Sequence, residues 1–231
     1  MSTEAGKVSV IMVHGAWAEG ASWARVVPLV ETTEVNVICA PLPLTTLSED
    51  INALNRTIER VEGPVILAAH AYAGAVIGAA NPERVKSLVY VAALAPDENE
   101  TVAEVFYRDE PHPKAPKLAP DSHGFIWMPD EGFADAFAQN ASAGELKLLA
   151  ATQRPIALAC IQEKVPKPIW KDTTSWFLIA EQDRMINPKT QRFMAGRMGA
   201  KIRSHEVDHA PLITAPHAVA DIIKEAIASI N

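Results

Sequence analysis

The stretch Val65–Gly74, VILAAHAYAG, decides the fold that we expect for this chain. Its first half is a short, continuous apolar run, which is typical of a strand buried on both faces of a parallel sheet. Its second half sets small residues around His70 and Ala71 and leads into a helical pattern at 73–80. Small residues permit a sharp turn from strand to helix, with residue 71 at the tip above the first amides of the helix. We therefore expect a strand-turn-helix unit here.

Similar units on both sides of this stretch predict a six-stranded, mostly parallel sheet flanked by helices. The predicted strands are Val8–Val13, Val35–Cys39, Val65–Ala69, Ser87–Ala92, Ser175–Ala180 and the more polar Lys201–Val207. The predicted helices are Ser22–Val30, Leu47–Val61, Ala73–Ala80, Pro188–Met198 and Pro216–Ile230, with Ser48 and Asn187 as N-caps of the second and fourth. This alternation implies right-handed crossovers around one sheet, which gives a three-layer α/β sandwich.

The segment 97–171 breaks the alternation. It contains no convincing long strand, and it holds the proline-rich piece Pro111–Pro120, PHPKAPKLAP. A long insertion between two strands of a compact domain usually forms a lid or cap. We therefore predict an α/β core made of 1–96 and 172–231, with a helical cap made of 97–171.

Composition narrows the classes of partner. The chain has 231 residues, 48% hydrophobic and 21% charged, with a net charge of −7, which is the balance of a globular protein. It has no Lys/Arg-rich run, no apolar stretch of membrane-spanning length and no secretory leader pattern, so we expect no nucleic-acid or membrane partner and a cytoplasmic location. Cys39 and Cys160 are interpreted as separate reduced thiols, with one disulfide as the alternative. Because neither metal-ligand spacing nor a phosphate-binding loop is present, no metal or cofactor is expected.

Polar residues gather where the predicted strands end. His14-Gly15-Ala16-Trp17 follows the first strand, Glu181-Gln182-Asp183 the fifth and Asp208-His209 the sixth. Ligands of open α/β sheets bind beyond the carboxyl ends of the strands. We therefore expect these three segments to meet beside Ala71.

Taken in order, these segments resemble the α/β-hydrolase superfamily and, within it, the hydroxynitrile lyase and methylesterase group. The resemblance spans essentially the whole chain, and it is carried by VHGAW at 13–17, the turn at 69–74, PERVKSLVYVAALAPDE at 82–98, AEQDRMINP at 180–188 and VDHAPLITAP at 207–216. It implies the α/β-hydrolase fold and a small-molecule carbonyl or ester substrate. The oligomeric state stays open, with a homodimer as one option.

The resemblance also implies roles for individual residues. His209 matches the catalytic base and Asp183 the acid that orients it, while the backbone N–H groups of Ala16 and Tyr72 match the oxyanion hole. Ala71 matches the position of the nucleophile, where the family has serine. A methyl group cannot attack a carbonyl, so ordinary serine esterase chemistry is excluded by this residue.

Further departures concern the neighbours of these residues. Lyases of the group commonly carry a lysine directly after the catalytic histidine, whereas this chain has Ala210, which argues against cyanohydrin cleavage. Two glycines of the turn motif are Ala69 and Ala73 here. Asp208 and Glu181 remain alternative candidates for the acid.

The residues predicted to contact a substrate are His14, Trp17, His70 and Trp127, and each has a packing interpretation as well. His14 is of a kind that often braces such loops, and His70 is more often a packed neighbour than a base. Tyr107, His112 and His123 of the insertion are weaker candidates for the same role.

Three explanations for Ala71 follow. The first is an enzyme that uses His209 and Asp183 as a general base or acid without a covalent intermediate. The second is an esterase disabled by a natural or engineered Ser→Ala change, which would leave Ala69 and Ala73 unexplained. The third is a non-catalytic member that binds a small molecule or a protein. The paired histidine and carboxylate favour the first.

Overall fold

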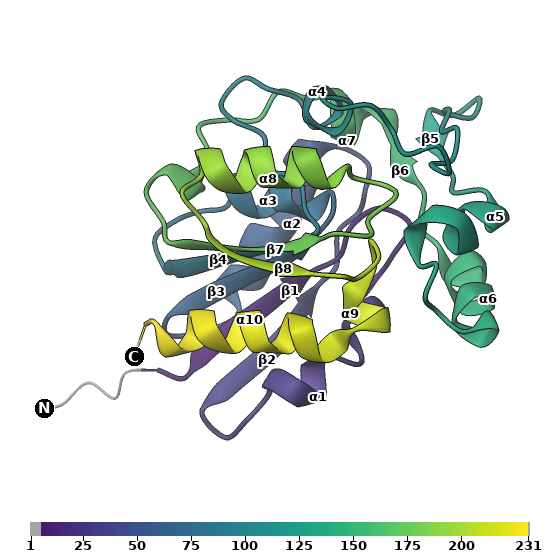
Figure 1. Ribbon diagram of the computed structural model, residues 1–231. Coiled ribbons are helices and arrows are strands. Elements are labelled where there is room, and N and C mark those ends of the chain that lie inside the picture. Colours follow the sequence, from purple (N-terminus) through teal and green to yellow (C-terminus); the bar gives the residue numbers. More distant parts are fainter. Residues whose placement is uncertain (1–5, 231) are drawn as a thin grey trace, which may run out of the picture.

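The computed structural model describes residues 6–230 and shows a parallel sheet between two layers of helices (Figure 1). The strand order is β2-β1-β3-β4-β7-β8, and every neighbouring pair is parallel. The strands are β1 (Val8–Val13), β2 (Val35–Ala40), β3 (Val65–His70), β4 (Val85–Val91), β7 (Ser175–Ala180) and β8 (Lys201–His205). The predicted three-layer α/β architecture is thereby confirmed, with strand ends shifted by at most two residues.

Burial explains the order of the strands. Every residue of β3 and β7 is buried, as continuous apolar runs require when helices cover both faces. The edge strand β8 is mostly exposed, in keeping with its polar sequence. Because all neighbouring strands are parallel, the carboxyl ends of β1, β3, β7 and β8 lie along one edge of the sheet, which we call the carboxyl edge.

The helices divide between the two faces of the sheet. α1 (Val27–Val30) and α10 (Pro216–Ala228) contact each other on one face, and α2 (Leu47–Glu59) contacts α3 (Ala73–Gly78) on the other (Figure 1). α8 (Pro188–Arg197) lies on the side of α3, and the short α9 (Pro211–Thr214) precedes α10. No helix within residues 6–230 has the length and apolar character needed to cross a membrane.

Two predictions about helix ends are wrong. The N-cap of α2 is Thr46 and not Ser48: the Thr46 hydroxyl accepts from Glu49 N at 3.0 Å, while Ser48 lies inside the first turn. The predicted helix Ser22–Val30 is broken into a 3-10 turn, Gly20–Trp23, and α1. Pro28 explains the break, because proline has no N–H to donate and is tolerated only in the first turn of a helix. The Asn187 cap of α8 is confirmed by its bond with Lys189 N.

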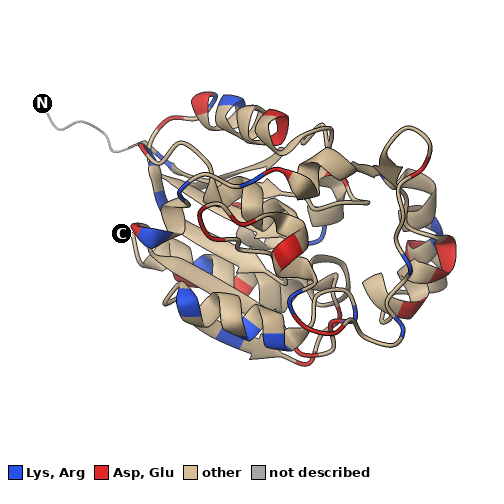
Figure 2. Ribbon diagram, turned by 90° about the horizontal axis from the view of Figure 1, so that it is seen from above, with Lys and Arg blue, Asp and Glu red and all other residues tan. Residues whose placement is uncertain are grey.

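The insertion between β4 and β7 extends beyond the sheet on one side in both views (Figures 1 and 2). It contains α4 (Val102–Phe106), β5 (Phe125–Ile126), α5 (Asp130–Gly132), a π-helical turn (Phe133–Phe137), α6 (Ala143–Thr152), β6 (Ile156–Ala157), α7 (Leu158–Gln162) and a 3-10 turn (Ile169–Lys171). Its β5 and β6 form a two-residue antiparallel pair, so the predicted lack of a long strand is confirmed. Both cysteines are free thiols, as expected.

Candidate active site

The turn at Ala71 joins β3 directly to α3 and is as sharp as predicted. Ala71 has φ of +51°, in the left-handed region where residues with a Cβ are strained. Its carbonyl oxygen accepts from Leu94 N at 2.9 Å and from Gly74 N at 3.1 Å. A Cβ on Gly74 would collide with the carbonyl oxygen of Leu94, so only glycine fits there. The turn is thus fixed by the backbone of the segment that follows β4.

The loop after β1 lies against this turn. A Cβ added to Gly15 would lie 3.0 Å from both the Ala71 Cβ and the His70 carbonyl oxygen, so glycine permits the close approach. Ala16, Ala71 and Tyr72 border the same cavity. Neither Ala16 N nor Tyr72 N donates a hydrogen bond to another group of residues 6–230. These two N–H groups are therefore available to an oxygen atom of a ligand.

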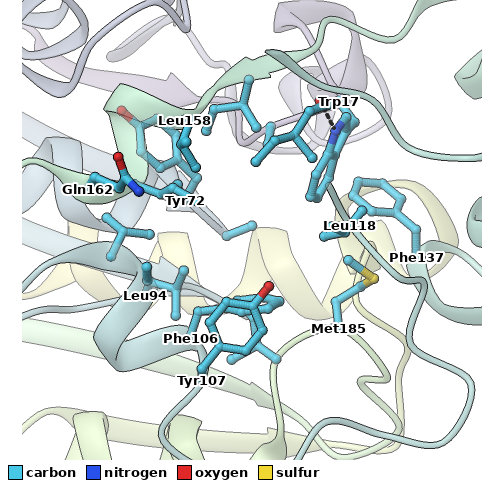
Figure 3. Close-up of a pocket in the computed structure, with 18 of the residues that line it drawn as sticks. Trp17, Tyr72, Leu94, Phe106, Tyr107, Leu118, Phe137, Leu158, Gln162 and Met185 are labelled. Carbon is cyan, nitrogen blue, oxygen red and sulfur yellow. Dashed lines mark hydrogen bonds between the residues drawn. The ribbon is translucent and has the colours of Figure 1, made fainter. Parts of the chain in front are cut away.

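Two carbonyl groups of the insertion hold the next residue of this loop, Trp17. Its backbone N–H donates to Arg154 O at 2.9 Å, and its indole Nε1–H donates to Ile126 O at 2.9 Å (Figure 3). Trp17 has φ of +56°, a conformation that needs such support. The position of the neighbouring Ala16 amide therefore depends on the insertion.

The histidine and the carboxylate predicted from the strand ends form a buried pair. His209 Nδ1 lies 2.8 Å from Asp183 Oδ2, and their side chains are 3% and 0% exposed. Asp183 also accepts from Met185 N, Ile186 N and Gln191 Nε2 at 2.7–2.9 Å, which fixes the orientation of its carboxylate. Because the carboxylate accepts the Nδ1–H, the Nε2 of His209 is left as the basic nitrogen, and His209 borders the cavity beside Ala71.

The two alternative acids lie elsewhere. Asp208 accepts from Asn140 N at 2.9 Å and from the Thr214 hydroxyl at 2.6 Å, so it ties the insertion to α9. Glu181 is paired with Arg192 near the surface. Of the three candidates, only Asp183 has its carboxylate hydrogen bonded to the imidazole ring of His209.

The cavity has a volume of about 260 Å³ and almost entirely apolar walls (Figure 3). The loop after β1 and the turn at Ala71 form one part of the wall, and the insertion forms much of the rest. Among residues 6–230, no Lys, Arg, Asp or Glu borders the cavity, and the polar side chains of its border are those of Tyr72, Tyr107, Gln162 and His209. The insertion contributes Val102, Ala103, Phe106, Tyr107, Leu118, Pro120, Ile126, Phe137, Ile156, Leu158, Ile161 and Gln162.

Two histidines predicted to contact substrate are placed away from the cavity. His14 Nδ1 bonds with Gly15 O at 2.9 Å, and its Nε2 accepts from Leu42 N at 3.1 Å. His70 Nε2 donates to His209 O at 2.7 Å. Both rings are buried, and burial lowers the pKa of His14 to about 4 and that of His70 well below its usual value, so both are neutral at pH 7. They brace the loops around the site and do not face a ligand.

The two tryptophans differ in the same respect. Trp17 borders the cavity, whereas Trp127 is half exposed and donates its indole N–H to Asp121 at 3.2 Å. Of the four predicted substrate contacts, only Trp17 therefore borders the cavity, and His14, His70 and Trp127 do not.

One buried polar residue next to the site, Asp50 of α2, was not predicted from the sequence. It accepts from the hydroxyl of Tyr72 and is fully buried. A signal was present, because Asp50 stands three residues after Leu47 and four before Leu54, on the apolar face of the predicted helix. A charged residue at such a position calls for a buried partner. No group of three or more His, Cys, Asp or Glu side chains within residues 6–230 is arranged to hold a metal.

A parallel sheet with a strained strand-to-helix turn, a buried histidine-carboxylate pair and free amides at its carboxyl edge defines a class of protein. The family model described as the alpha/beta hydrolase family matches residues 10–222. The chain therefore belongs to this family. No curated protein matches it by sequence comparison.

Solved structures of similar fold cover nearly the whole chain. Polyneuridine aldehyde esterase is 18% identical with a TM-score of 0.80, and the comparison covers 97% of this chain and 100% of that one. A pyrethroid hydrolase from Sphingobium faniae is 21% identical with a TM-score of 0.78, covering 96% and 98%. A methylesterase from Arabidopsis is 14% identical with a TM-score of 0.77, covering 96% and 99%. At these identities the likeness shows the fold.

Proposed function

We propose that this protein is an enzyme that acts on a small carbonyl or ester compound through His209, without a covalent serine intermediate. In this proposal, Ala71 occupies the position of the family's nucleophile. Within the family, we group the protein with the methylesterases and hydroxynitrile lyases. The observation that carries the proposal is the buried His209–Asp183 pair, which opens onto an apolar cavity bordered by Ala71 and two unbonded amides.

In the proposed mechanism, the substrate carbonyl oxygen accepts hydrogen bonds from Ala16 N–H and Tyr72 N–H. His209 Nε2 removes a proton from the carbon next to the carbonyl, and the electron pair of the C–H bond moves to give an enolate. The two amides stabilise the negative oxygen, and Asp183 stabilises the imidazolium. Return of the proton from His209 to the carbon completes the cycle. If the next carbon carries a leaving group, the enolate instead reforms the carbonyl group, the electron pair makes a carbon–carbon double bond as the bond to the leaving group breaks, and the imidazolium gives its proton to the released group. The same base can instead take a proton from water that attacks an ester directly.

The methyl group of Ala71 favours this route. It cannot form an ester with the substrate, and it places no hydroxyl between His209 and the bound carbonyl compound. Loss of the serine from a catalytic triad removes most covalent catalysis and leaves only the contribution of the oxyanion hole and of binding. Base catalysis on carbon needs no such serine.

The walls of the cavity favour a neutral, largely apolar substrate. A charged substrate would lose its hydration there without meeting an opposite charge, because no Lys, Arg, Asp or Glu among residues 6–230 borders the cavity. Only a negative oxygen placed at the two amides would be compensated. An apolar cavity of about 150 Å³ is enough for benzene in another protein. The 260 Å³ here therefore suits one ring with a short chain that carries the carbonyl.

We also propose that segment 97–171 acts as the cap of this site over a core of 1–96 and 172–231. Phe106, Leu118, Phe137 and Leu158 of this segment border the cavity opposite the residues of the core. The insertion would then set which substrate shapes fit.

Hydrogen exchange at carbon tests the proposed function. A panel of neutral aryl ketones such as phenylacetone is incubated with the protein in D₂O, and loss of the α-proton signal is followed by NMR. We expect exchange at least about 100-fold above the buffer rate, the scale of general base catalysis, and its loss in His209→Ala. Equal exchange in the His209→Ala protein would remove His209 from the mechanism.

The disabled esterase is a second candidate, favoured by the same histidine, carboxylate and amides. A serine-to-alanine variant of a pyrethroid hydrolase, 21% identical with a TM-score of 0.79, is itself among the structures of similar fold. Ala71→Ser tests this candidate with 4-nitrophenyl esters. A burst of nitrophenol followed by sustained hydrolysis supports a disabled esterase, whereas an unchanged rate supports the noncovalent enzyme. Ketone binding without exchange in either protein supports a binding member of the family.

A further inference from the structure

Asp50 is a carboxylate in a place that packing alone would fill with an apolar side chain. It lies in the first turn of α2, between Leu47 and Leu54 on the buried face, and its exposed fraction is 0%. A buried carboxylate costs far more free energy than an apolar residue unless several donors and a favourable dipole meet it. The N-terminal end of α2 supplies the dipole. The donors come from outside the helix.

Three segments of the chain donate to Asp50. Leu44 N, in the loop before α2, donates to Oδ1 at 2.7 Å, and the Tyr72 hydroxyl donates to Oδ2 at 2.7 Å. The thiol of Cys160 in α7 lies 3.7 Å from the same oxygen, which makes a weak third contact. Burial raises the pKa of Asp50 and, to a greater extent, that of Tyr72, so the hydroxyl keeps its proton. The short contacts are thus those to the loop and to Tyr72.

Tyr72 is the residue on which this arrangement acts. It follows the strained Ala71, its N–H has no partner among the described residues, and its ring borders the cavity. Figure 3 shows its hydroxyl turned away from the cavity. Tyr72 is therefore held at its backbone by the turn and at the far end of its ring by Asp50. A left-handed turn at a residue with a Cβ persists only where its surroundings fix it from several sides.

We propose that Asp50 is a positioning residue of the active site, which anchors the hydroxyl of Tyr72 and so fixes the direction of the Tyr72 N–H toward a negative oxygen of the ligand. The proposal rests on the proposed function, because it takes that N–H as one of the two donors of the oxyanion hole. Asp50 acts through Tyr72 and does not touch the substrate.

A pair of probes with the same shape tests this role. 4-Nitrophenolate carries the negative oxygen of an enolate, whereas 4-nitrotoluene carries a methyl group in its place. Kd is measured for both, at a pH where the phenol is ionised, with the parent protein, Asp50→Asn, Tyr72→Phe and the double variant. Asp172→Asn, which alters an exposed carboxylate paired with Lys167, serves as the matched control.

We expect Asp50→Asn to lower the preference for the phenolate over nitrotoluene about tenfold, the scale of one hydrogen bond to a charged group, with nitrotoluene affinity unchanged. Tyr72→Phe keeps the ring and the carboxylate but removes the bond, so it should show the same loss, and the double variant should lose no more than either single one. A purely structural role would weaken both probes equally. Should Asp50→Asn fail to fold, Tyr72→Phe carries the test alone.

The outcomes separate the two proposals. A parent protein that binds the phenolate no better than nitrotoluene contradicts the oxyanion hole and thus the proposed function. A parent that prefers the phenolate, together with Asp50→Asn and Tyr72→Phe proteins that prefer it equally, overturns the role of Asp50 and leaves the proposed function standing.

Discussion

Two buried carboxylates, Asp183 and Asp50, each hold a side chain that borders the cavity beside Ala71. Asp183 holds His209 at 2.8 Å, and Asp50 holds the hydroxyl of Tyr72 at 2.7 Å. Both are fully hydrogen bonded by neighbouring donors. They differ in how the side chains of their partners meet the cavity: His209 borders it with the ring whose Nδ1 is held by Asp183, whereas the ring of Tyr72 borders it and the hydroxyl turns away.

This difference teaches that the residue type does not decide between a reacting and a supporting group. In the roles that we propose, Asp183 prepares the base that acts on the substrate, whereas Asp50 fixes the position of Tyr72. His14 and His70 belong with the second kind, because both ring nitrogens of His14 and the Nε2 of His70 bond with backbone groups around the site.

The largest expected effect is on turnover, and it distinguishes the two carboxylates. Asp183→Asn should lower kcat for ketone exchange about 10³–10⁴-fold, because the amide favours the wrong tautomer of His209. Asp50→Asn should lower it only about tenfold, the scale of one hydrogen bond to a charged group. NMR exchange kinetics with both variants measure the ratio. Equal losses in the two variants would contradict the different roles proposed for the two carboxylates.

A smaller effect, on the unfolding free energy, is expected from His14, which belongs with the supporting residues. Its pKa is lowered from 6.5 to about 4, chiefly by burial. Between these values the unfolded chain binds a proton at residue 14 that the folded protein does not bind, so the unfolding free energy falls as pH falls. The unfolding free energy is unaffected by this group above pH 6.5, and the group lowers it by about 3 kcal/mol by pH 4.

Urea unfolding between pH 8 and pH 4 measures this loss. In His14→Asn the dependence across the same window should flatten by a comparable amount, since the titrating ring is gone. A steep curve that survives the substitution would show that other groups cause it.

The smallest expected effect concerns the turn that separates the two carboxylates. Ala71→Gly should raise the unfolding free energy by about 1 kcal/mol, because glycine adopts positive φ without the strain of a Cβ. Ala73→Gly, two residues further on at the start of α3, is the matched control and should lower it by up to about 1 kcal/mol. Urea unfolding midpoints compare the two. A loss of stability in Ala71→Gly would mean that the turn is not strained.

The sheet could be predicted from the sequence because its strands carry their burial in their own residues. VILAA is apolar throughout and SWFLIA is apolar after Ser175, and both are buried strands of the sheet. The meeting of Asp183 with His209 could be predicted for a related reason: parallel strands end at one edge, so residues that follow them become neighbours.

Other features depend on segments far apart in the chain. The partner of Asp50 is 22 residues away in sequence, and the walls of the cavity come from an irregular insertion with no periodic pattern. The orientations of two imidazole rings could not be predicted either. His14 bonds with Leu42 N and His70 with His209 O, and neither ring borders the cavity. The break in the predicted helix Ser22–Val30, by contrast, has a visible signal in the sequence, because Pro28 lies inside this range.

The two carbonyl groups that hold Trp17 make this fold hard to divide into exchangeable parts. Arg154 O and Ile126 O belong to the insertion, yet they support the loop that carries Ala16. A chimera that grafts the insertion of a relative onto this sheet would change more than the shape of the substrate it admits. Unless the donor segment offers acceptors at both points, the graft would also loosen one of the amides, so specificity and rate would change together.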